Sequence, residues 1–221
     1  MPPSSASLDS KSFGGRAPAL ELSNISTLGN NVFVGSGSGN SNAVQGGNVF
    51  LGNFAGRDNT SGTENVYIGQ YAGAQNKFGS QNVFIGKTAG VTNTSGSRNV
   101  FLGTNVGTNN LIGSDNVFLG TKAGACNKVG NKNVFLGSQV GENNTSGSQN
   151  VFIGTESGQN NYAGSNNVFI GNESGRQNSQ GNANVFCGQL AGSSNSQGNS
   201  NVFLGTEAGQ NNSLGSNNVF V

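Results

Sequence analysis

Few side chains of this chain could do acid–base or metal chemistry. Its 221 residues include no histidine, which excludes Ser-His-Asp and Cys-His catalytic groups and His-bearing metal sites. The best carboxylate candidates are Glu156, Glu173 and Glu207, which share one position of the sequence repeat described below, and paired carboxylates cleave polysaccharides in glycosidases. Lys122 holds the same position in another copy, so an ordinary solvated face is favoured. We expect no catalytic residue, no metal, no cofactor and no enzyme activity.

Two cysteines could in principle form a disulfide. Cys126 and Cys187 fall in the sixth and tenth copies of the repeat described below, four copies apart. At about 4.8 Å per stacked copy they would lie about 19 Å apart, beyond the reach of a disulfide. Cys187 takes a place that Leu, Ile or Val holds elsewhere, and we expect it to be a small buried hydrophobic residue.

Charge and hydropathy limit the partners. The net charge is +1 with no Lys/Arg run, so nucleic acid and anionic membranes are not expected partners. No apolar run is long enough to span a bilayer, and the first ten residues have neither a charged nor an apolar region of a secretion signal. We therefore expect no membrane insertion.

A strict sequence repeat organises the rest of the chain. Asn-Val-Phe-Leu-Gly or a close variant begins at Asn31 and returns at every seventeenth residue, without insertion or deletion, until Asn218, in twelve copies. Counting each copy from its Asn, position 8 is small, position 9 is Gly, position 12 is Asn and position 15 is Gly except Gln45. Such strict spacing indicates a solenoid, and Gly at three corners is incompatible with a helix in each copy.

The predicted fold is all-β: a parallel β-solenoid of about 12 rungs, each with one strand and a turned return path. The predicted organisation is a polar tail over residues 1–13, a capping rung over 14–30 with a strand at 19–22, and the solenoid over 31–221. Glycines at positions 5, 9 and 15 provide positive φ or close chain approach. Stacked Asn side chains should form amide ladders, in particular at position 12: Asn42, Asn59, Asn76, Asn93, Asn110, Asn127, Asn144, Asn161, Asn178, Asn195 and Asn212.

The alternation of a strand leaves two choices for the side chains. Val and Leu point to one side and Phe to the other. The small residue at position 8 suggests a thin interior, so we place Val and Leu/Ile inside and the Phe column outside. Twelve aromatic side chains in register would expose more than about 1,000 Å², an apolar stripe that needs cover by self-association. The alternative is that Phe fills a wider interior and that Val and Leu face outward, which also leaves an apolar face to be covered.

The consensus Asn-Val-Phe-Ile-Gly-x-x-Ala-Gly-x-x-Asn-x-x-Gly-Ser-x resembles the repeats of bacterial and phage tail-fibre-domain proteins. It is also similar to the head repeats of YadA-type trimeric autotransporter adhesins. The resemblance covers residues 24–221 and implies a left-handed β-roll in a parallel homotrimer. It departs from those families because no coiled-coil stalk, anchor or chaperone domain is present. The residues that it places at the trimer axis, an oligomer interface, are Phe33, Phe50, Tyr67, Phe84, Phe101, Phe118, Phe135, Phe152, Phe169, Phe186, Phe203 and Phe220.

The predicted function is that of a structural fibre shaft of a phage tail or injection system, which presents a receptor-binding part at the surface of the virion or particle. Its predicted partners are copies of itself, including end-to-end stacking through the rung at Val221, and a baseplate or attachment protein at the N-terminus. The alternative is an adhesin or self-assembling filament at the cell surface or outside the cell. A surface glycan or receptor could stack on Phe54, Tyr71 or Tyr162. Ice binding is less favoured, because the side chains at position 6 are too irregular to match the ice lattice.

Overall fold

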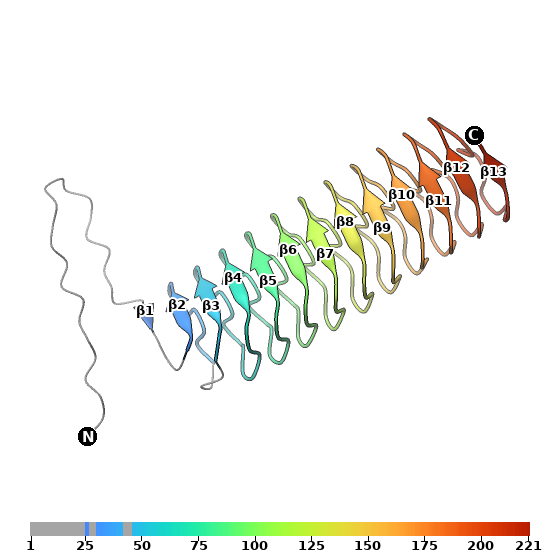
Figure 1. Ribbon diagram of the computed structural model, residues 1–221. Helices are drawn as coiled ribbons and strands as arrows, with labels where there is room; N and C mark the ends of the chain where they lie inside the picture. The colour runs from blue at the N-terminus through green and yellow to red at the C-terminus, as the bar shows by residue number, and fades with distance from the viewer. Residues whose placement is uncertain (1–24, 27–29, 42–45) are drawn as a thin grey trace, which may run out of the picture.

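The computed structural model describes residues 25–26, 30–41 and 46–221. This part of the chain is an all-β parallel solenoid of about 11 turns and contains no helix. It forms a straight rod with one short strand in every rung (Figure 1). The predicted fold class is confirmed at this level. The predicted tail over 1–13, the strand at 19–22 and Asn42 lie outside the described residues.

In the described part of the chain, thirteen strands form one sheet in chain order. They are β1 (Ile25–Ser26), β2 (Val32–Val34), β3 (Val49–Leu51), β4 (Val66–Ile68), β5 (Val83–Ile85), β6 (Val100–Leu102), β7 (Val117–Leu119), β8 (Val134–Leu136), β9 (Val151–Ile153), β10 (Val168–Ile170), β11 (Val185–Cys187), β12 (Val202–Leu204) and β13 (Val219–Phe220).

The register of the sheet follows from the repeat length. From β2 to β13 each strand pairs in parallel with the next, so that Val117 lies beside Val134 and Phe118 beside Phe135. Only β1 is antiparallel: it pairs with β2 and covers its outer edge. Because every copy has the same length, each position of the repeat forms a straight column along the rod.

Glycine allows the chain to turn at the corners of each rung for two different reasons. At positions 5 and 9 the backbone has positive φ, for example 128° at Gly120 and 56° at Gly124, which L side chains avoid. At position 15 the limit is space: a Cβ on Gly130 would collide with the Oδ1 of Asn127 and the carbonyl oxygen of Gly147. Both predicted roles of these glycines are confirmed.

Positive φ also occurs at positions 7 and 17, where it was not expected. These positions carry ordinary residues in the left-handed region, such as Lys122 with φ 57° and Asp115 with φ 61°. They lie on either side of the strand, where the chain turns. Such a conformation costs about 1 kcal/mol or more at each residue and persists only because the surrounding structure imposes it.

The Phe column lies inside the rod, which corrects the facing predicted from sequence. Ten members of the column, from Phe50 to Phe203, have no exposed surface, and Phe33 is 5% exposed. Their rings stack on those of the neighbouring rungs with centroids 4.7–5.0 Å apart. The alternative facing, with Phe inside and Val and Leu outside, is the one that the structure adopts.

The physical reason for this error is the return path of each rung. The small residue at position 8 suggested an interior too thin for an aromatic ring. This residue and the Gly at position 9 are instead what makes room for the ring: Ala123 is fully buried, and a Cβ on Gly124 would collide with the ring of Phe118. One Phe per rung therefore spans the interior from the strand to the return path. From Phe33 to Phe203 the rings are buried and cannot be an interface between copies, whereas Phe220 in the last rung is 43% exposed.

Candidate functional site

The side chains at positions 2 and 4 form an apolar face on the outside of the sheet, which we call the outer face. It is two columns wide. One column is Val in every rung, and the other is mainly Leu or Ile. Its most exposed members between the two ends of the rod include Leu119, Ile170, Val185 and Leu204, each with 36–40% of its surface exposed. The Val column is Val32, Val49, Val66, Val83, Val100, Val117, Val134, Val151, Val168, Val185, Val202 and Val219, and the second column is Val34, Leu51, Ile68, Ile85, Leu102, Leu119, Leu136, Ile153, Ile170, Cys187, Leu204 and Val221.

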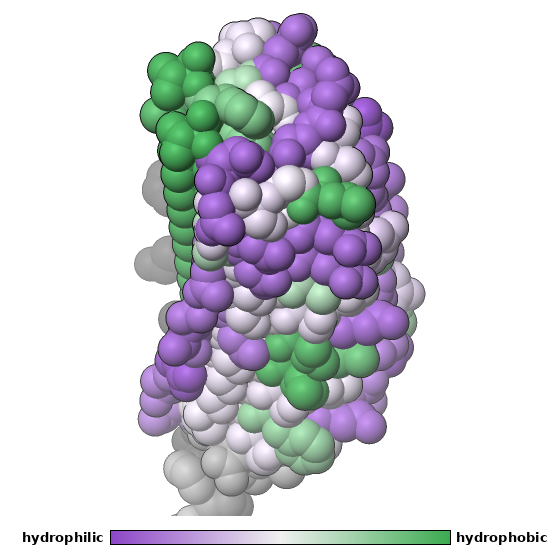
Figure 2. Space-filling model, turned by 90° about the vertical axis from the view of Figure 1, so that its right-hand side faces the viewer, coloured by the Kyte–Doolittle hydropathy of each residue, from purple (hydrophilic) through white to green (hydrophobic). Residues whose placement is uncertain are grey.

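The outer face is straight and continuous. Figure 2 shows an apolar stripe along the left edge of the molecule, with mainly hydrophilic surface beside it. The rings beneath it keep nearly the same orientation, with interplanar angles of 2–13° between successive rungs from Phe50 to Phe220. The strands from β2 to β13 also follow one another along the rod with little change of direction (Figure 1), so the sheet is almost untwisted, unlike most open sheets, whose neighbouring strands rotate by about 20–25°.

Two ladders of buried Asn side chains border the Phe column. At position 12 the amide nitrogen of Asn127 donates to the Oδ1 of Asn110 at 2.7 Å and to the carbonyl oxygen of Gly130 at 2.9 Å. The same contact between successive Asn side chains is present in every rung from Asn76 to Asn212, at 2.6–3.0 Å. The predicted ladder is confirmed over this range.

Position 1 forms a second ladder, which the sequence suggested only as one of its Asn columns. The Oδ1 of Asn116 accepts from both the backbone nitrogen and the side-chain nitrogen of Asn133, at 3.0 and 3.1 Å. The side-chain nitrogen of Asn116 donates to the carbonyl oxygen of Gly130 at 2.9 Å, the same oxygen that Asn127 uses. Both ladders thus meet at the glycine of position 15, and their buried amides are satisfied inside the chain.

The candidate aromatic residues for glycan contact do not form one site. Phe54 and Tyr71 are half-buried and stack on each other with centroids 5.2 Å apart, and a Cβ on Gly37 would lie 2.6 Å from the ring of Phe54. Tyr162 is 47% exposed and belongs to position 13, on a different column of the rod. The structure therefore brings two of the three residues together.

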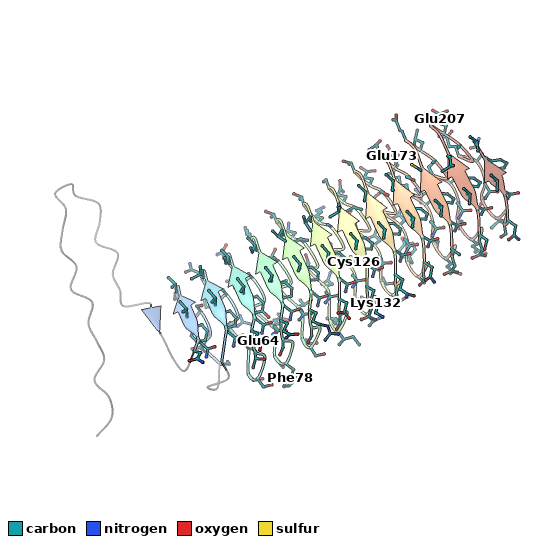
Figure 3. All side chains as sticks on the ribbon, viewed as in Figure 1. Glu64, Phe78, Cys126, Lys132, Glu173 and Glu207 are labelled. Carbon is teal, nitrogen blue, oxygen red and sulfur yellow. The ribbon has the colours of Figure 1, made fainter. Side chains whose placement is uncertain are left out.

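The candidate carboxylates lie along one edge of the rod, where Figure 3 labels Glu173 and Glu207. Glu156 and Glu173 on adjacent rungs both pair with Arg176, at 3.2 and 3.1 Å. The shared guanidinium balances part of their charge, in keeping with the expected solvated face.

One ion pair on the opposite edge shifts the pKa of a carboxyl group. Arg98 and Asp115 form two hydrogen bonds, at 2.6 and 3.0 Å. These bonds lower the pKa of Asp115 below its ordinary value, with a smaller opposing effect of burial. Both groups lie near the solvent, so the pair contributes little to stability.

Tyr67 is the one member of the inner column with a polar group. Its hydroxyl is fully buried and forms no hydrogen bond of acceptable geometry within the described structure. Burial raises its pKa well above the ordinary value of 10.0, and the nearby side chains of Asn82 and Asn76 oppose this rise.

Both cysteines are free, as expected. Cys187 is exposed on the outer face, so the prediction that it is buried is wrong, for the same reason as the facing of Phe. Within the described residues, no helix is long and apolar enough to cross a membrane, and no group of three or more His, Cys, Asp or Glu side chains could hold a metal ion.

No protein-family model, curated protein or solved structure matches the chain. The function of the chain is therefore inferred from the geometry of the rod and from the resemblance of its repeat. The feature of this rod that favours a partner is the outer face, which corresponds to the alternative facing of the strand. The sequence feature that could have predicted the outer face is the invariant Gly at position 9, which lies directly opposite the Phe ring.

Proposed function

We propose that this chain is a structural fibre shaft, built from copies that associate through the outer face. The observation that carries the proposal is the straight apolar stripe of two side-chain columns along the described rod. A continuous apolar patch of this kind, with a polar border, is typical of a protein interface. The inner column and both Asn ladders are complete within one chain, so each copy brings a rigid, preformed surface.

The location of this shaft follows from the resemblance of the repeat. We propose a tail fibre of a phage or injection system, which presents a receptor-binding part at the particle surface and is held by an attachment protein near the N-terminus. The resemblance implies three copies, and three copies would have to bring together their outer faces instead of their Phe columns. An antibody against the chain should label fibres on purified particles. Labelling of the cell envelope instead would support an adhesin.

Self-association is tested by charge on the outer face. In the double variant Ile153→Asp with Ile170→Asp, two carboxylates enter the apolar stripe, and burying them in an interface would be costly. We expect light scattering to give the mass of one chain for this variant and a larger mass for the parent chain. Far-UV circular dichroism should be unchanged, because the inner column is intact.

A matched control is available on another column of the rod. Leu111 and Ile112 are 38% and 53% exposed but do not belong to the outer face. Leu111→Asp with Ile112→Asp should leave the mass of the assembly unchanged. A parent chain that is monomeric at every concentration would contradict the proposal.

A further inference from the structure

We infer that two copies pair face to face through the outer face, with their rods parallel and in register about a two-fold axis that runs along the rod. The inference rests on the proposed function and names the partner and its orientation. It differs from the homotrimer that the resemblance implies.

The width of the outer face favours two copies over three. The face is one strand of three residues wide, which is about 10 Å at 3.3 Å per residue, and packed sheets lie about 10 Å apart. Two such faces cover each other over their full width. Three faces about 10 Å wide in a closed triangle would each lie about 3 Å from the axis, well below the half-spacing of about 5 Å that their side chains need.

The outer face is also flat, so the fit between two copies extends along the rod. Because the strands from β2 to β13 keep nearly the same direction along the rod (Figure 1), two copies stay in contact from one end to the other. The two columns expose roughly 1,000 Å² per copy, so that a pair would bury roughly 2,000 Å², the upper end of a standard stable interface.

The two columns decide the orientation. A two-fold axis along the rod places the Val column of one copy opposite the Leu/Ile column of its partner in the same rung, so Val117 faces Leu119. Every facing pair then joins a smaller side chain to a larger one, and the sheets stay equally spaced across their width. An axis along the strands would make the rods antiparallel and set Val against Val and Leu against Leu, which leaves the sheets closer at one edge than at the other.

The number of copies is measured first. Light scattering over a range of concentrations should give a constant mass of two chains. A mass of three chains would overturn the two-fold pair and leave the proposed function standing. A single chain at all concentrations would overturn both. A mixed complex that forms only with another protein would also overturn the pairing.

Cross-linking at the edges of the outer face then tests the orientation. All chains carry Cys126→Ser and Cys187→Val, and a short bismaleimide joins the new thiols. Ser200 and Thr206 are exposed and flank β12 on opposite sides. In the parallel pair, Ser200 of one copy lies across from Thr206 of the other. A mixture of Ser200→Cys chains and Thr206→Cys chains should therefore give covalent dimers.

A second mixture reports the antiparallel arrangement. With β2 to β13 fully overlapped in antiparallel rods, β12 would face β3, and Thr206 would lie across from the exposed Asn53, which follows β3. A mixture of Asn53→Cys chains and Thr206→Cys chains should give no covalent dimer above the level of either variant alone. Cross-linking of this mixture, with none in the first, would overturn the parallel register.

Discussion

The two sides of each strand differ in the contacts that their side chains make. The inner side carries one Phe per rung, fully buried between β7 and its return path in the case of Phe118. The outer side carries Val117 and Leu119, which stay partly exposed. Neighbouring residues of one strand thus serve the fold and the assembly separately, and changes on the two sides should have separable effects.

The largest expected effect is on the inner side. Phe118→Ala removes a fully buried ring and leaves a cavity between two stacked neighbours, and should lower the free energy of unfolding by about 3–5 kcal/mol in urea denaturation. Val117→Ala, one residue away on the outer side, should cost about 1 kcal/mol or less in the dissociated chain. An equal loss of unfolding free energy in the two variants would contradict the distinction between the inner and outer sides.

The polar border of the inner column should show the next largest effect. Asn127→Ala removes a buried amide that donates to Asn110 and Gly130 and leaves their oxygens without this donor, at a cost of about 1–3 kcal/mol. The exposed Asn53 offers a control, since Asn53→Ala should change the free energy of unfolding by no more than about 0.5 kcal/mol. A ladder variant as stable as this control would show that the ladders are dispensable.

A smaller effect is expected on the outer side, at Cys187. This residue is the one member of the second column other than Val, Leu or Ile, and it leaves its rung of the outer face underfilled. Cys187→Leu should strengthen association by about 1 kcal/mol, which is about fivefold in the dissociation constant measured by sedimentation. The stability of the dissociated chain should not change. Weaker association would indicate that this rung is already filled by the partner.

The smallest effect concerns Tyr67. The pKa of the Tyr67 hydroxyl is raised in the folded chain, so just above pH 10 this hydroxyl ionises only in the unfolded chain. Ionisation favours the unfolded chain, and the folded chain therefore loses stability as the pH rises above 10. Tyr67→Phe should remove this part of the alkaline destabilisation and be neutral or slightly stabilising at pH 7. The measurement is urea unfolding of both chains from pH 7 to 11. The same alkaline loss in both chains would mean that Tyr67 is not buried.

The strand positions, the register and the Asn ladder were predictable because each follows from the exact period of the sequence repeat. The facing of the strand was not, since a period of two fits both choices equally well. Gly124 is what decides between them, because only a residue without a Cβ leaves space for the ring of Phe118. That information lies in the contact between the strand and the return path of one rung, and no count of hydrophobic residues contains it. The positive φ of Asp115 and Lys122 was equally hidden, because ordinary side chains occupy these positions.

The most direct test of the account compares the reactivity of two thiols on opposite sides of one strand. Phe118→Cys and Leu119→Cys are each introduced into the chain that carries Cys126→Ser and Cys187→Val, and their rates with a thiol reagent are measured over a range of protein concentrations. We expect the thiol at position 118 to be protected in the folded chain at every concentration. We expect the thiol at position 119 to react rapidly in dilute solution and to become protected as copies associate. Rapid, concentration-dependent reaction at 118 with constant protection at 119 would contradict both expectations.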